Sequence, residues 1–238
     1  FTPGALACNK EVSGGNDDGS GIRMGMAVGG AVTHMDQFFA TVPFFPPASL
    51  VKGIFINGRG ERFINEDAYH GRVAHYVLRQ PEGKAWLLVD DEIFGRPVIK
   101  PDVTVAAVGE TWDEVEAELG LPAGSLVHTV STFNEQAAAG RDPFLHKAPD
   151  WLRPLTKAPF AAISYCRTDL EAHAFTLGGL ATRPSGEVLD GDGQPIRGLF
   201  AAGRSACGLP RWGEGYSSGL SLGDSTFFGR MAGKSAAA

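Results

Sequence analysis

The chain has 238 residues, of which 43% are hydrophobic and only 20% are charged, with 32 glycines and a net charge of −6. This apolar fraction excludes a disordered chain, and the length suffices for one large domain or two small ones. The acidic balance and the scattered Lys and Arg residues argue against a nucleic-acid binder. No apolar run reaches the roughly 20 residues that a membrane-spanning helix needs.

The three cysteines, Cys8, Cys166 and Cys207, are far apart and odd in number. This usage is typical of free thiols in a reducing compartment. The sequence has no Cys-x-x-Cys or His-Glu-x-x-His spacing, so no metal site is expected. Residues 1–8 lack the basic start and apolar stretch of a signal peptide. We therefore expect a cytoplasmic location.

The N-terminal part begins with a Gly/Asn/Asp-rich loop at residues 13–21. Residues 22–32 predict a helix of small residues. One side of this helix is expected to pack tightly, and that side consists of Met24, Ala27, Val28 and Ala31. The prolines of Pro43–Pro47 then break the pattern and mark a boundary.

In the middle of the chain, residues 53–57 and 62–65 are two short β-prone runs. They are joined at Gly58-Arg59-Gly60, which is a hairpin signature. Residues 85–89 form an apolar run that predicts a buried strand.

Two helices are predicted next. Thr111 and Glu114 have the spacing of a capping box, which opens a helix that ends at Gly120. A second helix is expected over about residues 126–139, and Gly140 ends it. Together with the hairpin, these elements indicate an α+β middle part.

The chain changes character near Leu170. A turn-rich β segment leads to an apolar strand at 198–202 and then to the glycine-rich stretch 203–219. A helix is predicted from Ser221 onward, with Ser221 and Asp224 as a second capping box.

This C-terminal sequence of strand, glycine loop and helix can form an anion site. Glycine lets backbone N–H groups approach a ligand, and a helix N-terminus has unpaired donors and a partial positive charge. Such a site suits a phosphate or an electron-rich ring edge. Ordinary packing of a strand and helix on glycine remains the alternative.

Residues 215–219 also match the G-x-S-x-G elbow of serine hydrolases. That elbow must follow a strand and precede the other triad members. Here glycine and proline precede it, and the last histidine, His173, lies upstream, so we regard the match as accidental. The hydroxyls of Tyr216 and Ser218 could contact a substrate carbonyl or relay a proton. For the tyrosine, simple packing is the alternative.

Several motifs lie in an order that points to one family; they are residues 19–25, 57–66, 178–180, 198–203 and 219–222. They resemble the FAD-dependent fumarate reductase/succinate dehydrogenase flavoprotein superfamily. The resemblance implies an α/β FAD-binding domain of the glutathione-reductase-like type, with its N-terminal Rossmann part missing and an α+β substrate (cap) domain inserted. The end of the first FAD-domain segment would be 1–47, the cap domain 48–169 and the C-terminal FAD-domain segment 170–238.

The resemblance also implies a set of FAD-binding residues, namely Gly203, Arg204, Gly219, Ser221 and Leu222. The backbone at 221–222 would face the pyrimidine edge of the flavin, where a helix N-terminus stabilises charge. The dinucleotide fingerprint G-x-G-x-x-G is absent from the sequence. A separate N-terminal FAD-binding segment is therefore expected as a partner, and this chain alone is expected to bind FAD weakly or not at all.

Two sequence differences from the fumarate reductases narrow the range of possible substrates. Where those enzymes have a histidine and an arginine, this chain has Phe175 and Tyr216, which suit a flat apolar ligand. The resemblance is greatest to 3-ketosteroid dehydrogenases of the 4-ene-forming (5α) type. It implies that Tyr69, Tyr216 and Ser218 are catalytic, and that Phe175 and Gly219 contact an apolar ketone, a steroid. The alternatives are another FAD-dependent enoate or enone reductase, or a non-catalytic fragment of such an enzyme.

Overall fold

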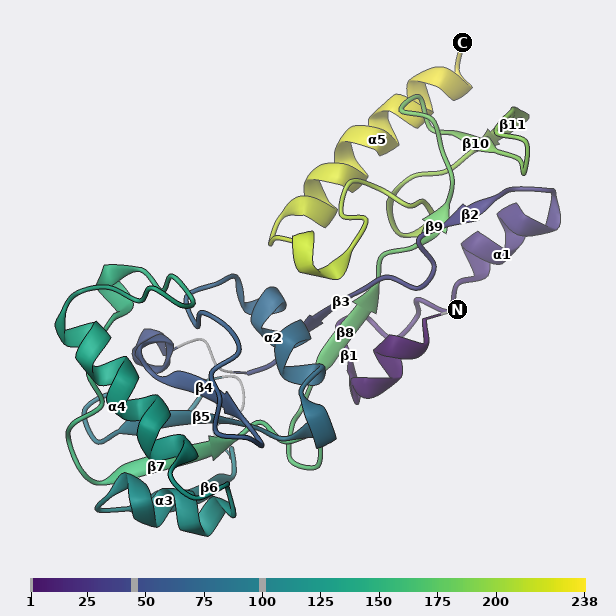
Figure 1. Cartoon of the computed structure of the whole chain (residues 1–238). Helices are drawn as coiled ribbons and strands as arrows, with labels where there is room; N and C mark the ends of the chain where they lie inside the picture. Colours follow the sequence, from purple (N-terminus) through teal and green to yellow (C-terminus); the bar gives the residue numbers. More distant parts are fainter. Residues whose placement is uncertain (1, 44–46, 99–101) are drawn as a thin grey trace. The chain divides into compact units, whose positions relative to one another are not determined.

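The computed structural model describes residues 2–43, 47–98 and 102–238. The chain divides into two compact units: unit 1 contains residues 1–40 and 173–238, and unit 2 contains residues 41–172 (Figure 1). The break expected at Pro43–Pro47 includes residues 44–46, which lie outside the described residues. The roles of the two units as flavin and cap domains stay a prediction.

The core of unit 2 is a four-stranded antiparallel sheet of β4 (Ile54–Asn57), β5 (Ala85–Asp90), β7 (Phe160–Ser164) and β6 (Val105–Gly109), in this order. Every residue of the first three strands is buried. A strand that is buried on both faces has a continuous apolar run instead of an alternating one. The buried strand predicted at 85–89 is therefore confirmed.

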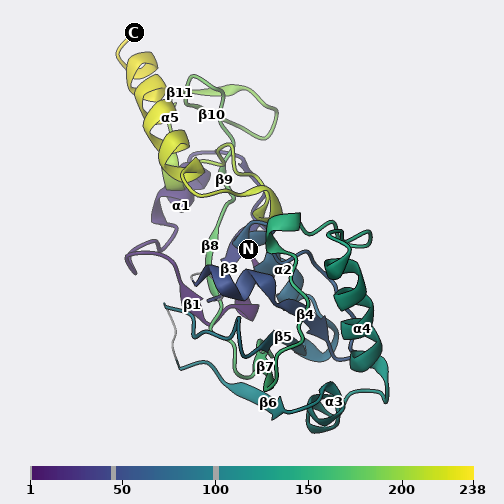
Figure 2. The ribbon, with the colours of Figure 1, turned by 90° about the vertical axis from the view of Figure 1, so that its left-hand side faces the viewer.

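Three α-helices accompany this sheet: α2 (His70–Leu78), α3 (Trp112–Leu119) and α4 (Ser125–Ala138). Thr111 Oγ1 accepts the Glu114 N–H at 3.3 Å, and Gly120 ends α3 with φ +63°, so the predicted cap and stop are confirmed. In both views α3 lies beside β6 (Figure 2). The buried Glu116 of α3 accepts N–H groups of Gly124 and Leu126 at the start of α4, at 2.6 and 2.8 Å.

The hairpin expected at 53–65 forms only in part. Its first run is β4, and the Gly60 N–H donates to the Asn57 carbonyl at 3.0 Å in the turn. The second run is not a strand, because only a single bridge joins Ile56 and Arg62. The Arg62 side chain forms ion pairs with Glu66 and Asp142, so tertiary contacts as well as the bridge hold this segment.

Unit 1 contains three small sheets. The first has the order β1 (Lys10–Glu11), β8 (His173–Thr176) and β3 (Phe38–Thr41, whose last residue belongs to unit 2). The other two pair β2 (Val32–Thr33) with β9 (Gly179–Leu180), and β10 (Glu187–Leu189) with β11 (Pro195–Phe200). The strand predicted at 198–202 is therefore β11, which begins three residues earlier and ends at Phe200.

Two α-helices, α1 (Ser20–Ala27) and α5 (Leu220–Ala236), belong to unit 1. The helix predicted at 22–32 was too long, because Gly29 adopts φ +93° and the chain continues into β2. The expected packing side was also wrong, since Met24 is 71% exposed. The helix packs through Gly25, where a Cβ would lie only 2.5 Å from the Leu180 side chain.

Short 3-10 turns complete the two units; they are η1 (Pro3–Ala7), η2 (Ala48–Lys52), η3 (Pro81–Gly83), η4 (Pro149–Trp151), η5 (Gly203–Ser205) and η6 (Gly213–Gly215). The turns η5 and η6 lie in the glycine-rich stretch before α5. The fold is thus mixed α/β, as expected. None of the described helices is long and apolar enough to cross a bilayer.

Candidate functional site

The start of α5 has no side-chain cap. Its N-cap is Gly219 with φ +93°, and no side chain accepts a hydrogen bond from the first turn. The predicted capping pair of Ser221 and Asp224 is wrong, because the buried Asp224 accepts the Leu209 N–H at 2.8 Å instead. The first N–H groups of a helix have no acceptor within the helix. The backbone at Ser221 and Leu222 therefore offers donors to a ligand.

A small cavity of about 30 Å³ brings several predicted residues together. Its lining includes Phe175, Gly203, Arg204 and Ser221, from β8, η5 and α5. Gly219 and Leu222 do not line this cavity, and the Leu222 side chain is 71% exposed. Of the predicted cofactor-binding residues, the structure thus gathers Gly203, Arg204 and Ser221 around one cavity and leaves the other two outside its wall.

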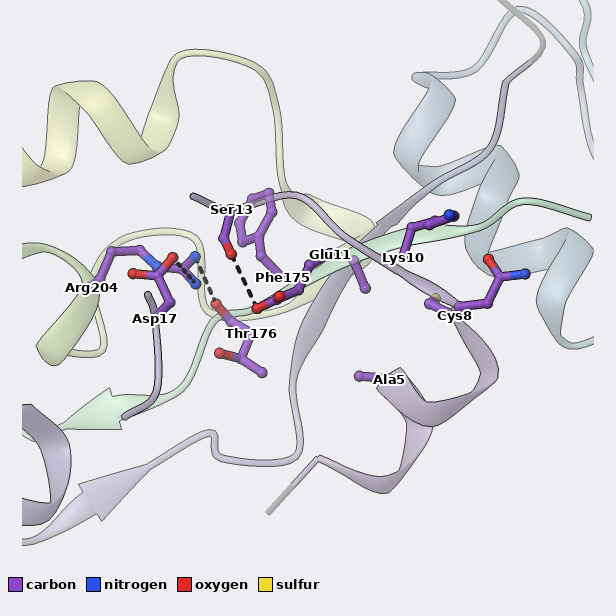
Figure 3. Close-up of a pocket in the computed structure, with 11 residues that line it drawn as sticks. Ala5, Cys8, Lys10, Glu11, Ser13, Asp17, Phe175, Thr176 and Arg204 are labelled. Carbon is purple, nitrogen blue, oxygen red and sulfur yellow. Dashed lines mark hydrogen bonds and ion pairs between the residues drawn. The ribbon is translucent and has the colours of Figure 1, made fainter. Parts of the chain in front are cut away.

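A larger pocket of about 370 Å³ shares Phe175, Thr176 and Arg204 with that cavity. Figure 3 shows Arg204 and Asp17 at one end of this pocket and Cys8 and Lys10 at the other. Burial raises the pKa of the Cys8 thiol to about 11, so the thiol is protonated at neutral pH. The pocket therefore has charged groups of both signs but no reactive thiolate from Cys8.

Arg204 connects the glycine loop to strand β8. Its guanidinium lies 3.5 Å from the Asp17 carboxylate and 3.5 Å from the Thr176 carbonyl oxygen. It also lies over the Phe175 ring, 5.2 Å from the centroid. Both side chains of this ion pair are 42% exposed. Solvent weakens such a pair, so an incoming anion can compete with Asp17 for the arginine.

Three aromatic rings of unit 1 are in mutual contact. The Tyr216 ring lies 4.6 Å from the Phe39 ring and 5.2 Å from the Phe175 ring, and Phe39 and Phe175 are 4.9 Å apart. Phe39 was not predicted from the sequence, because a phenylalanine in an apolar strand has the same signature as any core residue. We call these three residues the aromatic triad.

Ser218 lies two residues after Tyr216 in the loop before α5, and it is exposed. Tyr216 follows the 3-10 turn η6 and has extended backbone angles. Ser217, the serine of the G-x-S-x-G match, follows the 3-10 turn η6, and the preceding strand, β11, ends at Phe200. A nucleophile elbow requires a strand directly before its serine, so the structure agrees with our interpretation of the match as accidental.

Tyr69 belongs to unit 2, where it is the residue before α2. Its carbonyl oxygen accepts the N–H groups of Arg72 and Val73 at 2.8 and 3.2 Å. The ring lies 4.3 Å from the His70 ring. Beside it is a pocket of about 240 Å³, lined by Val51, Glu66, Asp67, Ala68, Tyr69, His70 and Trp151.

Burial lowers the pKa of His70, so its imidazole is neutral at pH 7. One ring nitrogen of His70, Nδ1, lies 2.8 Å from the Thr41 hydroxyl. A neutral imidazole has one donor and one acceptor nitrogen, and this contact fixes its orientation next to Tyr69.

A buried ionic network underlies the Tyr69 segment. The Glu66 carboxylate accepts the Phe55 N–H at 2.8 Å and pairs with Arg62 at 3.0 Å and with Lys147 at 3.1 Å. The Glu66 and Lys147 side chains have no exposed area. Buried carboxylates of this kind need several donors to offset lost hydration. Arg62 and Glu66 are close in sequence, but Lys147 comes from a distant segment, so the complete network was not predicted.

Within the described ranges, no three His, Cys, Asp or Glu side chains gather as metal ligands. The 370 Å³ pocket is instead lined by charged side chains of both signs, namely Lys10, Glu11, Asp17 and Arg204.

The comparisons with a family model, with known proteins and with solved structures indicate the same protein family. The model of the FAD binding domain family matches residues 9–220. A 3-oxo-5-alpha-steroid 4-dehydrogenase of Comamonas testosteroni is 29% identical over 205 residues, covering 78% of this chain and 39% of that protein. A probable fumarate reductase of Shewanella frigidimarina is 27% identical over 232 residues, covering 92% of this chain and 38% of that protein.

Among solved structures, the chain is similar to 3-ketosteroid-delta4-(5alpha)-dehydrogenase from Rhodococcus jostii RHA1, solved in complex with 4-androstene-3,17-dione. The TM-score is 0.83 at 41% identity, covering 93% of this chain and 46% of that one. The chain thus spans less than half the length of these relatives.

FAD is the cofactor of this family, and the residues of unit 1 fit it in chemical type. Gly219 has φ +93° and a Cβ there would meet no atom within 4 Å, so the N-terminus of α5 is open to a ligand. Arg204 and the N–H groups at Ser221 and Leu222 suit phosphate oxygens or the electron-rich edge of a flavin. Because the family model matches residues 9–220, well over half of the sequence, the chain belongs to the FAD-binding domain family of fumarate reductase and succinate dehydrogenase flavoproteins.

Proposed function

We propose that this chain is part of a flavoprotein that dehydrogenates a 3-ketosteroid next to its ketone. The contact between the Phe175 and Tyr216 rings carries the proposal. Aromatic side chains here offer a flat apolar surface where a dicarboxylate enzyme needs cations. Arg204, which lies over the Phe175 ring, is paired with Asp17. The similarity to a 3-ketosteroid-delta4-(5alpha)-dehydrogenase supports the same substrate class.

In this proposal, bound FAD would accept a hydride from the substrate. The carbon that loses the hydride is adjacent to the carbon next to the ketone. This chain contributes the proton chemistry. The hydroxyls of Tyr216 and Ser218 accept the proton from the carbon next to the ketone and pass it on, and Tyr69, a residue of unit 2, is the third proposed catalytic residue. Backbone N–H groups around Gly219 stabilise the enolate oxygen that develops. Phe175 and Gly219 contact the substrate.

The cofactor role of Gly203, Arg204, Gly219, Ser221 and Leu222 is part of the proposal. So is the division into a flavin part, residues 1–47 and 170–238, and a cap, residues 48–169. The N-terminal FAD-binding segment, which carries the nucleotide-binding fingerprint, is the proposed partner. Exposed apolar side chains on α1 and α5, Met24, Leu222 and Phe227, support a contact surface for that segment. A cytoplasmic location stays a prediction.

The first test replaces Tyr216 by phenylalanine in the complete flavoprotein. A missing acid–base group lowers the rate by about 100- to 10,000-fold. The measurement is kcat for a saturated 3-ketosteroid with an artificial electron acceptor. Tyr76→Phe is the control, because Tyr76 is on α2 and lines none of the pockets described above. Full activity of the Tyr216→Phe variant would refute the proposal.

A specific alternative is an enoate or enone reductase of the same family, and the similarity to a fumarate reductase favours it. The two functions differ in what bleaches the flavin. A saturated 3-ketosteroid reduces the flavin of a ketosteroid dehydrogenase under anaerobic conditions, so its absorbance near the visible maximum falls. Absence of bleaching, together with steroid-independent oxidation of the reduced flavin by an enone, would favour the alternative.

The third hypothesis is that the chain is a non-catalytic fragment of such an enzyme. The chain is then expected to bind FAD weakly or not at all on its own. Titration of the purified chain with FAD, followed by flavin fluorescence, tests this expectation, and a stoichiometric yellow complex would contradict it.

A further inference from the structure

Phe39 is the buried member of the aromatic triad. It is only 4% exposed, whereas Phe175 and Tyr216 are half-buried. Phe39 is on β3 and Phe175 on β8, which are neighbours in one sheet. The Leu177 N–H donates to the Gln37 carbonyl at 3.0 Å, so backbone hydrogen bonds fix the spacing of the two strands. The two phenylalanines therefore form a rigid base for a third ring.

The Tyr216 ring lies on this base. Its backbone N–H donates to the Gly213 carbonyl at 3.2 Å, but the residues that follow, Ser217 and Ser218, are exposed. Among the residues that the structure describes, the Tyr216 hydroxyl has no hydrogen-bond partner. Ring contacts thus hold the side chain, and the hydroxyl remains available to a ligand.

The geometry of these contacts favours one ring orientation. The Phe175 and Tyr216 rings are nearly perpendicular, at 80°, and the Phe39 ring is tilted by 48° to the Tyr216 ring. Edge-to-face and tilted arrangements are the ones that the quadrupoles of aromatic rings prefer. A leucine at position 39 would fill part of the volume but would lack the face against which the tyrosine packs.

We propose that Phe39 is a positioning residue for Tyr216: with Phe175 it sets the orientation of the phenol and leaves the hydroxyl unbonded for proton transfer. The inference rests on the proposed function for the role of that proton transfer, but the packing itself does not depend on flavin or steroid. This positioning favours the reaction rate, because an acid–base group is effective only within a narrow range of positions relative to the substrate.

The first test uses the chain without cofactor. Tyrosine rings are labelled with ¹³C, and the Tyr216 resonance is identified as the one missing from Tyr216→Phe. Phe39→Leu removes a ring 4.6 Å away, so the Tyr216 resonance is expected to shift and to show greater ring mobility. The other tyrosines, all in unit 2, are expected not to move. An unchanged Tyr216 resonance would overturn the proposal.

A matched control is Phe55→Leu. Phe55 is fully buried in unit 2, and its ring lies 5.0 Å from that of Tyr165. This variant is expected to shift the Tyr165 resonance and not that of Tyr216. Should Phe39→Leu fail to fold, Phe175→Leu tests the same packing from the half-buried side. It must shift the Tyr216 resonance, and an unchanged resonance would overturn the proposal.

The second test measures steady-state rates in the complete flavoprotein. Phe39→Leu is expected to lower kcat by about tenfold with little change in KM, because a small misplacement of a catalytic group affects the reaction step. Phe39→Tyr, which keeps the ring, is expected to restore most of the rate. A rise in KM with unchanged kcat would assign Phe39 to substrate binding and overturn the positioning role. If Tyr216→Phe is fully active, the proposed function fails, while the resonance shift still reports on the packing.

Discussion

The two units of this chain are stabilised in different ways. Unit 2 has a continuous antiparallel sheet with buried strands and an ionic network with no exposed side-chain area at its centre. Unit 1 has strands of two to six residues in three small sheets, and its helices expose large apolar side chains such as Met24 and Leu222. Unit 2 therefore has an extensive buried sheet, whereas unit 1 has a smaller set of buried apolar residues, such as Leu180 and Val188, and exposes apolar side chains on its helices.

The largest effect is expected from Glu66→Ala in unit 2. This change leaves Arg62 and Lys147 as buried cations without their shared carboxylate and leaves the Phe55 N–H without its acceptor. Breaking a buried pair by removing one partner costs about 3–5 kcal/mol. Urea unfolding, followed by far-UV circular dichroism, measures the loss.

A matched control for this variant is the exposed ion pair between Glu82 and Lys84. Glu82→Ala is expected to leave stability unchanged, because solvent screens such pairs. Equal losses in the two variants would mean that the buried network contributes no more than a surface pair, and the contrast between the units would lose its main support.

A smaller effect is expected from Gly178→Ala in unit 1. A Cβ at this position would lie 2.5 Å from the His34 carbonyl oxygen and 2.5 Å from Met35 Cα. Both are backbone atoms, so two chain segments must separate, at a cost of about 1–3 kcal/mol. Gly191→Ala is the control, since a Cβ there meets no atom within 4 Å. If both variants unfold at the same urea concentration, unit 1 does not depend on the close backbone approach at Gly178.

These differences also explain which elements could be predicted from the sequence. Helix α3 has its cap and stop in the local sequence, at Thr111 and Gly120, and β5 is a continuous apolar run. Interactions between residues near in sequence leave a local pattern, so these elements were predicted correctly. The prediction failed for 62–65 and for Asp224, whose partners, Asp142 and Leu209, lie elsewhere in the chain.

The features of the candidate site also differ in whether local sequence or tertiary contacts determine them. The donor-rich start of α5 follows from local glycine chemistry, although the capping pair assigned to it was wrong. The grouping of Phe175, Gly203, Arg204 and Ser221 around one cavity depends on tertiary contacts, and only the family resemblance pointed to it. Phe39 left no signal, because the contact of its ring with Tyr216 arises from the folding of distant segments.

The smallest effect is expected when the pH is lowered, and it concerns the stability of unit 2. Burial lowers the pKa of His70 below the ordinary 6.5, so the folded state favours the neutral imidazole. As the pH falls through about 6.5, the unfolded chain binds a proton that the folded chain does not, and stability decreases until the pH reaches the folded pKa. The nearby groups Tyr69, Glu66 and Asp67 line the same pocket, and the Thr41 hydroxyl lies 2.8 Å from the ring.

The measurement is urea unfolding of the wild type and of His70→Gln between pH 5 and pH 8. Glutamine can hydrogen-bond to Thr41 but does not titrate, so the variant should lose less stability on acidification. The two curves are expected to run parallel above pH 7 and to converge below it. Equal acid dependence would show that protonation of His70 does not couple to folding, and the burial of this imidazole next to Tyr69 would then not contribute to the pH dependence of stability.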